Sequence, residues 1–408
     1  MSSSFTNPFR PGAGHRPPYL AGRKQEQTEF RKLLNQTVLT DNLVLTGLRG
    51  VGKTVLLDEF KSIAVSENWL WVGTDLSESA SISENSMAQR LLADLSVVTS
   101  AITIPMGERL TVGFGSLPDK LLVTLGFETL WSIYQSTPGL NVDKLKAVFQ
   151  IVARHLPATK RGIVFAYDEA QNLADHAAKE QFPLSTLLDL FQSIQKMGFP
   201  FLLALTSLPT LFPKFVESRT YSERMFRVLF LRQLDDTETR EAIIKPVKYG
   251  NCPVTFSATT IGSITKLSGG YPYFVQFICR ETYDAFIQKI SDGKEEVVPI
   301  NEILIKLDTD FFAGRWAKVT DRQQELLYVI SQLNNADSEF TVQEILSQSN
   351  NLLVKPFSRS HINQMLSSLI TSGLVYRDRH GKYLFAVPLM ADFIKRVMKD
   401  SPLVIINI

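Results

Sequence analysis

The residues with the clearest chemistry lie together at positions 47–54. They read Gly-Leu-Arg-Gly-Val-Gly-Lys-Thr, which satisfies the pattern G-x-x-x-x-G-K-[ST] at Gly47, Gly52, Lys53 and Thr54. Glycines let the backbone turn so that its amide groups converge on an anion, and a following helix adds its N-terminal dipole. The pattern therefore predicts a phosphate-binding loop in which Lys53 contacts the β- and γ-phosphates and Thr54 binds Mg²⁺.

A chance glycine-rich turn would satisfy the same pattern, so the neighbouring elements decide between the two interpretations. Residues 42–46 (NLVLT) predict a short buried strand before the loop, and residues 55–65 predict a helix after it. Strand, loop and helix in this order are the context that a phosphate-binding loop requires. We therefore expect ATP and Mg²⁺ as ligands, held by Gly47, Leu48, Arg49, Gly50, Val51, Gly52, Lys53, Thr54 and Val55.

Two carboxylates follow another apolar run. Residues 162–167 (GIVFAY) predict a buried strand, and Asp168 and Glu169 come directly after it. Asp168 would join Thr54 in holding Mg²⁺ through water, and Glu169 would orient and deprotonate an attacking water. A surface turn is the alternative, because Asp and Glu commonly follow strands. A glutamate in this place favours water over a small-molecule hydroxyl as the phosphoryl acceptor.

The elements that must position these residues alternate along the chain. Further strands are predicted at 69–75, 199–206 and 227–231, separated by helical stretches. This alternation predicts an α/β fold with a parallel sheet and helices on both faces. Residues 236–290 read as helical, with a break at 268–270. The order helix, helix, helix, strand, strand at 322–333, 341–347, 358–372, 374–377 and 382–386 is typical of a winged helix-turn-helix.

Composition narrows the function classes. The 408 residues carry a net charge of +2, which excludes a globally polybasic nucleic-acid binder but leaves room for a local basic patch. Two cysteines without a CxxC pair or a histidine cluster make a zinc site or a disulfide scaffold unexpected. No apolar run reaches the roughly 18 residues that a membrane helix needs. We expect a soluble, cytoplasmic protein.

Four features together resemble the AAA-type P-loop ATPases related to STAND and origin-recognition ATPases of bacteria and archaea. They are Gly22-Arg23 with Glu26, similar to a GR-x-x-E box; the loop at 47–54 as the Walker A motif; Asp168-Glu169 as Walker B; and 268–272 (SGGYP), similar to a GG-x-P lid motif. The resemblance implies three parts: an ATPase domain with an N-terminal arm at 1–235, a helical lid at 236–312 and a winged helix-turn-helix domain at 313–408.

The same resemblance implies further binding roles. Arg23 and the arm before it would lie near the adenine, and Pro272 of the lid would pack against the base. Thr206 or Ser207, at the end of the fourth strand, would be the polar sensor beside the γ-phosphate. Origin-recognition ATPases usually carry a lid arginine, and the matching stretch here reads Tyr271-Pro272-Tyr273. That difference puts a lid arginine acting within the same chain in doubt.

An arginine finger, which would complete the catalytic set of Glu169 and Lys53, has candidates just before the fifth strand. Residues 218–227 (SRTYSERMFR) hold three arginines. Arg224, or else Arg219, would act across a subunit interface by stabilising charge on the transferring phosphoryl group. A solvated basic helix end is the equal alternative, and the finger would require a nucleotide-dependent homo-oligomer.

The C-terminal module has an excess of basic residues. Residues 355–400 contain eight Lys and Arg against three Asp, an excess of five. Candidate contacts to double-stranded DNA stand on its third helix and on its wing, and they are Arg359, His361, Asn363, Arg377, Arg379 and Lys382. Such modules also pack on the lid or contact proteins, so a protein partner is the alternative.

Two hypotheses of function remain. The first is an ATP-hydrolysing molecular switch, slow or stimulated by a partner, that changes the position or partner of the C-terminal module. The second is a DNA-binding regulator in which ATP is mainly a structural ligand. A small-molecule kinase is disfavoured because Glu169 favours water as the acceptor.

Overall fold

The computed structural model describes residues 6–12, 14–105, 122–219, 222–250, 252–292, 298–379 and 381–399. The chain forms two compact units. Unit 1 comprises Met1–Gly22, Gly47–Gly52 and Leu231–Ile408, and unit 2 comprises Arg23–Thr46 and Lys53–Phe230. The three-part division at 235 and 312 stays a prediction.

Unit 2 is built on a five-stranded parallel sheet of order β2-β5-β6-β1-β7. Its strands are β1 (Asn42–Thr46), β2 (Trp69–Val72), β5 (Gly162–Tyr167), β6 (Phe201–Ser207) and β7 (Phe226–Phe230). Every residue of β1, β5 and β6 is buried, which is why the central residues of these strands are apolar. The predicted α/β class with a parallel sheet is confirmed.

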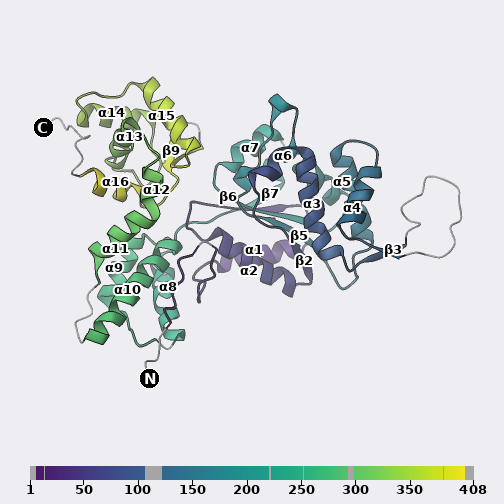
Figure 1. The fold of residues 1–408 in the computed structure, drawn as a ribbon, viewed down its shortest axis with the longest axis horizontal. Helices are drawn as coiled ribbons and strands as arrows, with labels where there is room; N and C mark the ends of the chain where they lie inside the picture. Colours follow the sequence, from purple (N-terminus) through teal and green to yellow (C-terminus); the bar gives the residue numbers. More distant parts are fainter. Residues whose placement is uncertain are drawn as a thin grey trace. The chain divides into compact units, whose positions relative to one another are not determined.

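Helices cover both faces of this sheet. Figure 1 shows α1 and α2 on one side and α3, α5 and α6 on the other. A small antiparallel hairpin of β3 and β4, which the sequence did not predict, stands between α3 and α4. The bounds are α1 (Lys24–Leu34), α2 (Lys53–Ser66), α3 (Glu84–Thr99), β3 (Thr103–Pro105), β4 (Leu122–Thr124), α4 (Phe127–Ser136), α5 (Asn141–Arg154), α6 (Pro183–Lys196) and α7 (Leu211–Ser218).

A buried asparagine and a glycine fix how the strands of the sheet approach their neighbours. The buried side chain of Asn42 exchanges hydrogen bonds with Gln195 of α6, and its Oδ1 accepts from the backbone N of Leu203 at 2.8 Å. Gly73 follows β2 at φ 130°, and a Cβ there would stand 1.8 Å from the carbonyl oxygen of Ala166. Only glycine therefore lets β2 approach β5 this closely.

Unit 1 is mainly helical after Leu231. Helices α8 and α9 are separate, so the stretch predicted as helical from 236 has an additional break before Ala258. The last helix, α16, was not predicted. The bounds are α8 (Asp236–Tyr249), α9 (Ala258–Ser268), α10 (Pro272–Asp292), α11 (Ile300–Leu307), a π-helical turn (Asp308–Phe312), α12 (Ala313–Trp316), α13 (Asp321–Ser331), α14 (Val342–Leu352), α15 (Arg359–Thr371), β8 (Val375–Arg379), β9 (Lys382–Phe385) and α16 (Met390–Met398).

The described part of the N-terminal arm packs on the helical residues 236–292 of unit 1. Asn7 Nδ2 donates to Asp284 Oδ1 at 2.7 Å, and Phe9 is buried and stacks on Phe256. Tyr19 donates to Glu241 of α8 at 2.8 Å. The arm, which we assigned to the ATPase domain, makes these contacts with α8, with α10 and with the segment between α8 and α9. Among the described helices, none is long and apolar enough to cross a membrane.

Candidate nucleotide-binding site

The carboxylate of Asp168 lies at the centre of a polar cluster in unit 2. Its Oδ2 accepts a hydrogen bond from Thr54 Oγ1 at 2.5 Å, and its Oδ1 accepts from Thr206 Oγ1 and from the backbone N of Glu169. Because parallel strands end at the same edge of a sheet, Asp168 after β5 and Thr206 on β6 meet the first turn of α2. The structure thus brings together three residues that were predicted from separate parts of the sequence.

These oxygens fit a magnesium ion. A threonine hydroxyl and a carboxylate are hard oxygen ligands, and Mg²⁺ usually takes one or two of them together with water and substrate phosphates. Within the part of the chain that the structure describes, no group of three His, Cys, Asp or Glu side chains lies close enough to hold a metal by itself. Phosphate and water would therefore have to complete the coordination of an ion held by Thr54 and Asp168.

Glu169 has an unusual backbone conformation. Its φ of 54° and ψ of 34° are left-handed, and its side chain is exposed and pairs with the amide of Gln171. Gln171 in turn accepts from the backbone N of Leu208, just after β6, at 3.1 Å. A non-glycine residue in this region is strained, and such strain is often found at functional sites.

Lys214 of α7 braces the segment that follows Glu169. Its Nζ donates to the carbonyl oxygens of Gln171 and Leu173, and burial lowers its pKa. The sequence did not point to Lys214 or Gln171. Their involvement depends on where α7 packs, which no local pattern encodes.

Two further hydroxyls lie unpaired at the same edge of the sheet. Thr46 and Ser207 are partners in the register of β1 and β6, both are buried, and neither hydroxyl has a hydrogen-bond partner among the described residues. Thr206 is already bonded to Asp168, so Ser207 has the free donor that a phosphate sensor needs. Which of the two contacts phosphate stays a prediction. Thr46, directly before the loop, was not singled out from the sequence.

Three glycines of the loop adopt backbone angles or close approaches that a residue with a Cβ would not tolerate. Gly50 has φ 78° and Gly52 has φ 89°, both in the left-handed region, and the carbonyl of Gly50 accepts from the backbone N of Tyr273 at 3.1 Å. A Cβ on Gly47 would stand 2.6 Å from the carbonyl oxygen of Leu231. The loop therefore depends on all three glycines, and the residues after it, Lys53, Thr54 and Val55, open α2.

The lid motif forms the turn between α9 and α10. Gly269 and Gly270 have φ of 56° and 73°, and a Cβ on Gly270 would stand 2.3 Å from the carbonyl oxygen of Leu234. Pro272 is the first residue of α10, where its missing N–H costs nothing. In unit 2, Arg23 is the N-cap of α1, is buried and pairs with Glu26 at 3.4 Å.

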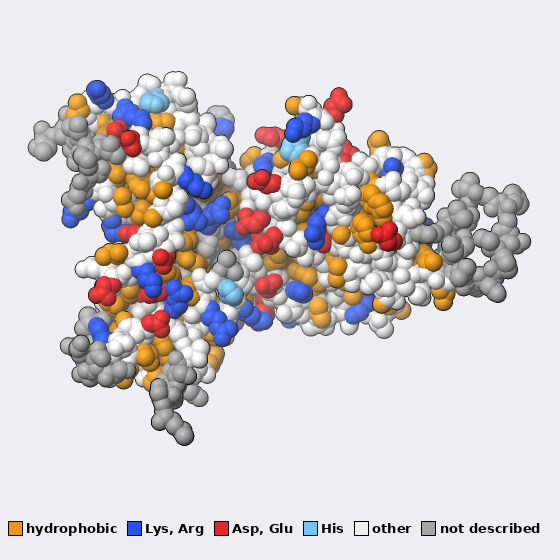
Figure 2. All heavy atoms as spheres, in the orientation of Figure 1, with side chains coloured by type: hydrophobic (Ala, Val, Ile, Leu, Met, Phe, Trp, Pro, Cys, Tyr) orange, Lys and Arg blue, Asp and Glu red, His pale blue; other side chains and the backbone are white. Residues whose placement is uncertain are grey.

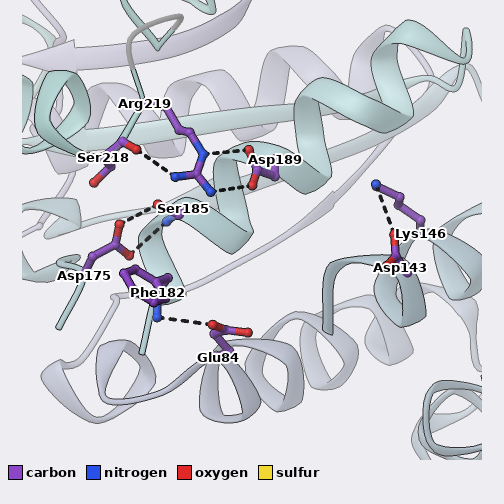
Figure 3. A network of polar contacts seen from close by, with 9 residues as sticks. All are labelled: Glu84, Asp143, Lys146, Asp175, Phe182, Ser185, Asp189, Ser218 and Arg219. Carbon is purple, nitrogen blue, oxygen red and sulfur yellow. Dashed lines mark hydrogen bonds and ion pairs between the residues drawn. The ribbon is translucent and has the colours of Figure 1, made fainter. Parts of the chain in front are cut away.

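The two finger candidates have different surroundings. Arg219 makes a two-pronged ion pair with Asp189 of α6 at 3.1 and 2.8 Å, which Figure 3 shows beside the Asp175–Ser185 contact. Arg224 is exposed and lines a groove of about 440 Å³ with Lys196 and Gln192. It precedes β7, at the end of the parallel sheet opposite Asp168.

The C-terminal module has its predicted order of helices and hairpin. Ile362, Met365, Leu366 and Leu369 of α15 are buried, as predicted. The candidate DNA contacts Arg359, Asn363 and Arg377 are exposed, His361 and Lys382 are half-buried, and the Arg379 side chain lies outside the described residues. Arg396, which was counted in the basic excess, forms an ion pair with Asp308 at 2.5 and 2.9 Å, so its charge is neutralised within unit 1.

Comparisons with known proteins agree with this arrangement. Residues 19–204 match the family model described as AAA ATPase domain, and residues 309–394 match a domain of unknown function (DUF8462). No curated protein matches the sequence. The fold resembles the Walker-type ATPase of Pyrococcus abyssi, at 15% identity over 93% of this chain and 97% of that chain, with a TM-score of 0.58.

The ORC2 protein of Aeropyrum pernix has a similar fold in two structures. Its ADP form matches at 14% identity over 96% of this chain and 98% of that one, with a TM-score of 0.55. Its ADPNP-ADP complexes match at 14% identity over 95% and 97%, with a TM-score of 0.53. Residues 19–204 thus resemble AAA ATPase domains, and the fold of the chain resembles that of an origin-recognition protein, so the predicted resemblance to AAA-type ATPases of this kind is confirmed.

Proposed function

We propose that this chain is an ATP-dependent molecular switch whose nucleotide state controls its C-terminal module. The observation that carries the proposal is the cluster of Thr54, Asp168 and Thr206, which joins the loop to the carboxyl edge of the sheet. A related fold, ORC2 of Aeropyrum pernix, has been solved with ADP and with ADPNP, which supports adenine nucleotides as the ligands. Thr54 and Asp168 would hold Mg²⁺, which neutralises charge on the phosphates.

Hydrolysis would use water activated by Glu169. The exposed carboxylate, held in a left-handed turn directly after Asp168, can reorient once the contact to Gln171 is released. Replacing Glu169 by Gln should keep ATP binding and lower the turnover rate by about a hundredfold or more, as expected for loss of a general base.

Glu180 supplies a matched control for this variant. It is also an exposed glutamate at φ 54°. Glu180→Gln should leave turnover unchanged, and equal loss in both variants would contradict the assignment of Glu169. If Glu169→Gln abolishes turnover but leaves the response of the C-terminal module to ATP and DNA intact, ATP is a structural ligand and the chain is a DNA-binding regulator.

Double-stranded DNA is the partner we propose for the C-terminal module as a winged helix. Arg359 and Asn363 stand exposed at the start of α15, and Arg377 stands exposed on β8. Such residues suit phosphate and base-edge contacts. Arg377→Ala should weaken duplex binding and reduce the salt slope by about one, whereas Lys318→Ala, exposed outside the proposed surface, should change neither.

Arg224 would act across a subunit interface of a nucleotide-dependent homo-oligomer. Its exposure and its place opposite Asp168 support a role in trans rather than within its own chain. Sizing the protein with ATP and Mg²⁺ should show a larger species than without nucleotide, and Arg224→Ala should lower turnover only under conditions that assemble it. A monomer under all conditions would remove Arg224 from the site.

A further inference from the structure

Arg49 of the phosphate-binding loop carries a buried donor that is not used. Its Nε is inaccessible to solvent and has no hydrogen-bond partner among the described residues. Its Nη2 lies 3.7 Å from the position that a Cβ on Gly373 would occupy, so the guanidinium rests against the turn between α15 and β8. A buried, unsatisfied donor is costly unless another state of the molecule supplies its acceptor.

A second arginine lies near the same place in unit 1. Arg315 of α12 stacks on the ring of Phe311 at 4.5 Å and donates to the carbonyl of Phe311. Burial, and after it the positive charge of Arg49, lower the pKa of Arg315. In the described parts of the chain no carboxylate forms an ion pair with either arginine, so neither positive charge is neutralised by a salt bridge.

Aromatic packing ties both arginines to the lid. Tyr273 of α10 donates its backbone N–H to Gly50, next to Arg49, and its ring lies 5.0 Å from that of Phe311. Figure 2 shows Lys and Arg side chains gathered over the region where Figure 1 places α12 and β9. Tyr273 therefore links the neighbour of Arg49 in the loop to the ring on which Arg315 stacks.

We propose that Arg49 and Arg315 form a phosphate-binding pair that takes the terminal phosphate of the bound nucleotide. An anion between them would remove their mutual repulsion, and the planar guanidinium matches phosphate oxygens in a two-pronged geometry. Arg49 stands four residues before Lys53 in the same loop, so its ligand is a phosphate at that loop. Because Arg315 lies on the segment joining the lid to the C-terminal module, its engagement would report the terminal phosphate to that module.

This inference rests on the proposed function and is tested through the difference between ATP and ADP. Calorimetry on the full chain gives Kd for Mg-ATP and Mg-ADP in the wild type, Arg315→Gln and Lys318→Gln. Loss of one charge-assisted contact should weaken ATP binding about tenfold to a hundredfold and leave ADP binding within about twofold. Lys318 lies three residues after Arg315 and is exposed, so it supplies a matched control. Its variant should bind both nucleotides as the wild type does.

Other outcomes separate this pair from the proposed function. An unchanged preference for ATP over ADP in Arg315→Gln, or equal loss of both, overturns the pair while the ATPase assignment stands. If the wild type binds neither nucleotide, the proposed function fails, and titration with inorganic phosphate tests the pair alone: binding lost in Arg315→Gln supports it, and no binding overturns it. Weakened duplex DNA binding with intact nucleotide preference also overturns it.

A folding defect is distinguished by a second variant. Arg315→Lys keeps the charge and the apolar stem over Phe311 but lacks the two-pronged donor. If Arg315→Gln melts below the wild type, Arg315→Lys should still fold and show an intermediate loss of ATP binding. Wild-type preference for ATP in a folded Arg315→Lys variant, with Arg49→Gln also unaffected, would overturn the pair.

Discussion

Replacement of Asp168 separates its structural role from its proposed role in magnesium binding. In Asp168→Ala, Thr206 and the backbone N of Glu169 both lose their acceptor, and Thr206 is completely buried. An unsatisfied buried donor costs about 1–3 kcal/mol. Two such groups, with some relaxation, give an expected destabilisation of about 3 kcal/mol.

Asp168→Asn should behave differently. The asparagine oxygen can still accept from Thr206 and from the N of Glu169, while its Nδ2 faces Thr54, whose hydroxyl can rotate and accept. We expect the free energy of unfolding to change by less than about 1 kcal/mol. The negative charge is lost in both variants, so both should lose Mg²⁺-dependent hydrolysis.

The assay is urea unfolding followed by tryptophan fluorescence, together with hydrolysis measured across a Mg²⁺ titration. At about 2–4 °C per kcal/mol, Asp168→Ala should also melt about 6–12 °C below the wild type. Equal destabilisation by Ala and Asn would refute the hydrogen-bond account of this cluster. Wild-type hydrolysis in Asp168→Asn at ordinary Mg²⁺ concentrations would refute its role as a metal ligand.

Three further predictions concern the scaffold. Gly73→Ala should destabilise the sheet by more than about 3 kcal/mol in urea unfolding, because its Cβ would overlap a carbonyl of β5; a smaller change would contradict the close approach. Arg219→Gln should cost less than about 1 kcal/mol in the same assay, since its pair with Asp189 is one-third exposed. Burial would raise the pKa of Glu344, but hydrogen bonds from Thr341 prevail and lower it. The ionised Glu344 therefore stabilises the folded state above the ordinary glutamate pKa of about 4.3, and this stabilisation is lost as the pH falls through the lowered pKa. Glu344→Gln should lower the free energy of unfolding at pH 6 and match the wild type near pH 3. A difference that stays constant with pH would contradict this.

The parts of the fold that could be predicted are those where a local pattern and burial coincide. β1 and β5 have the predicted bounds because helices cover both faces of the sheet and every residue of these strands is apolar or buried. β2 stops at Val72, three residues before the predicted end, and Asp75 keeps only an isolated bridge to Asp168. The strands β3 and β4 are three residues each, too short to stand out as a periodic pattern.

The residues of the candidate site also fall into those that a local sequence pattern predicts and those that long-range packing places. Lys53, Thr54 and Asp168 were identified because the loop pattern and an apolar strand ending in a carboxylate are contiguous in sequence. Thr46 depends on the register of β1 against β6, and Lys214 depends on the packing of α7. Long-range placement of this kind has no local signal, and the same holds for the meeting of Arg49 with Arg315.

Nucleotide binding by the loop is the claim on which the rest depends, and calorimetry tests it most directly. The wild-type chain with Mg²⁺ should bind ATP and ADP at one site, and Lys53→Ala should bind ATP at least about tenfold more weakly, because the lysine supplies a charged contact to the β- and γ-phosphates. A folded wild-type protein that binds no nucleotide, or a Lys53→Ala variant with unchanged affinity, would contradict the account.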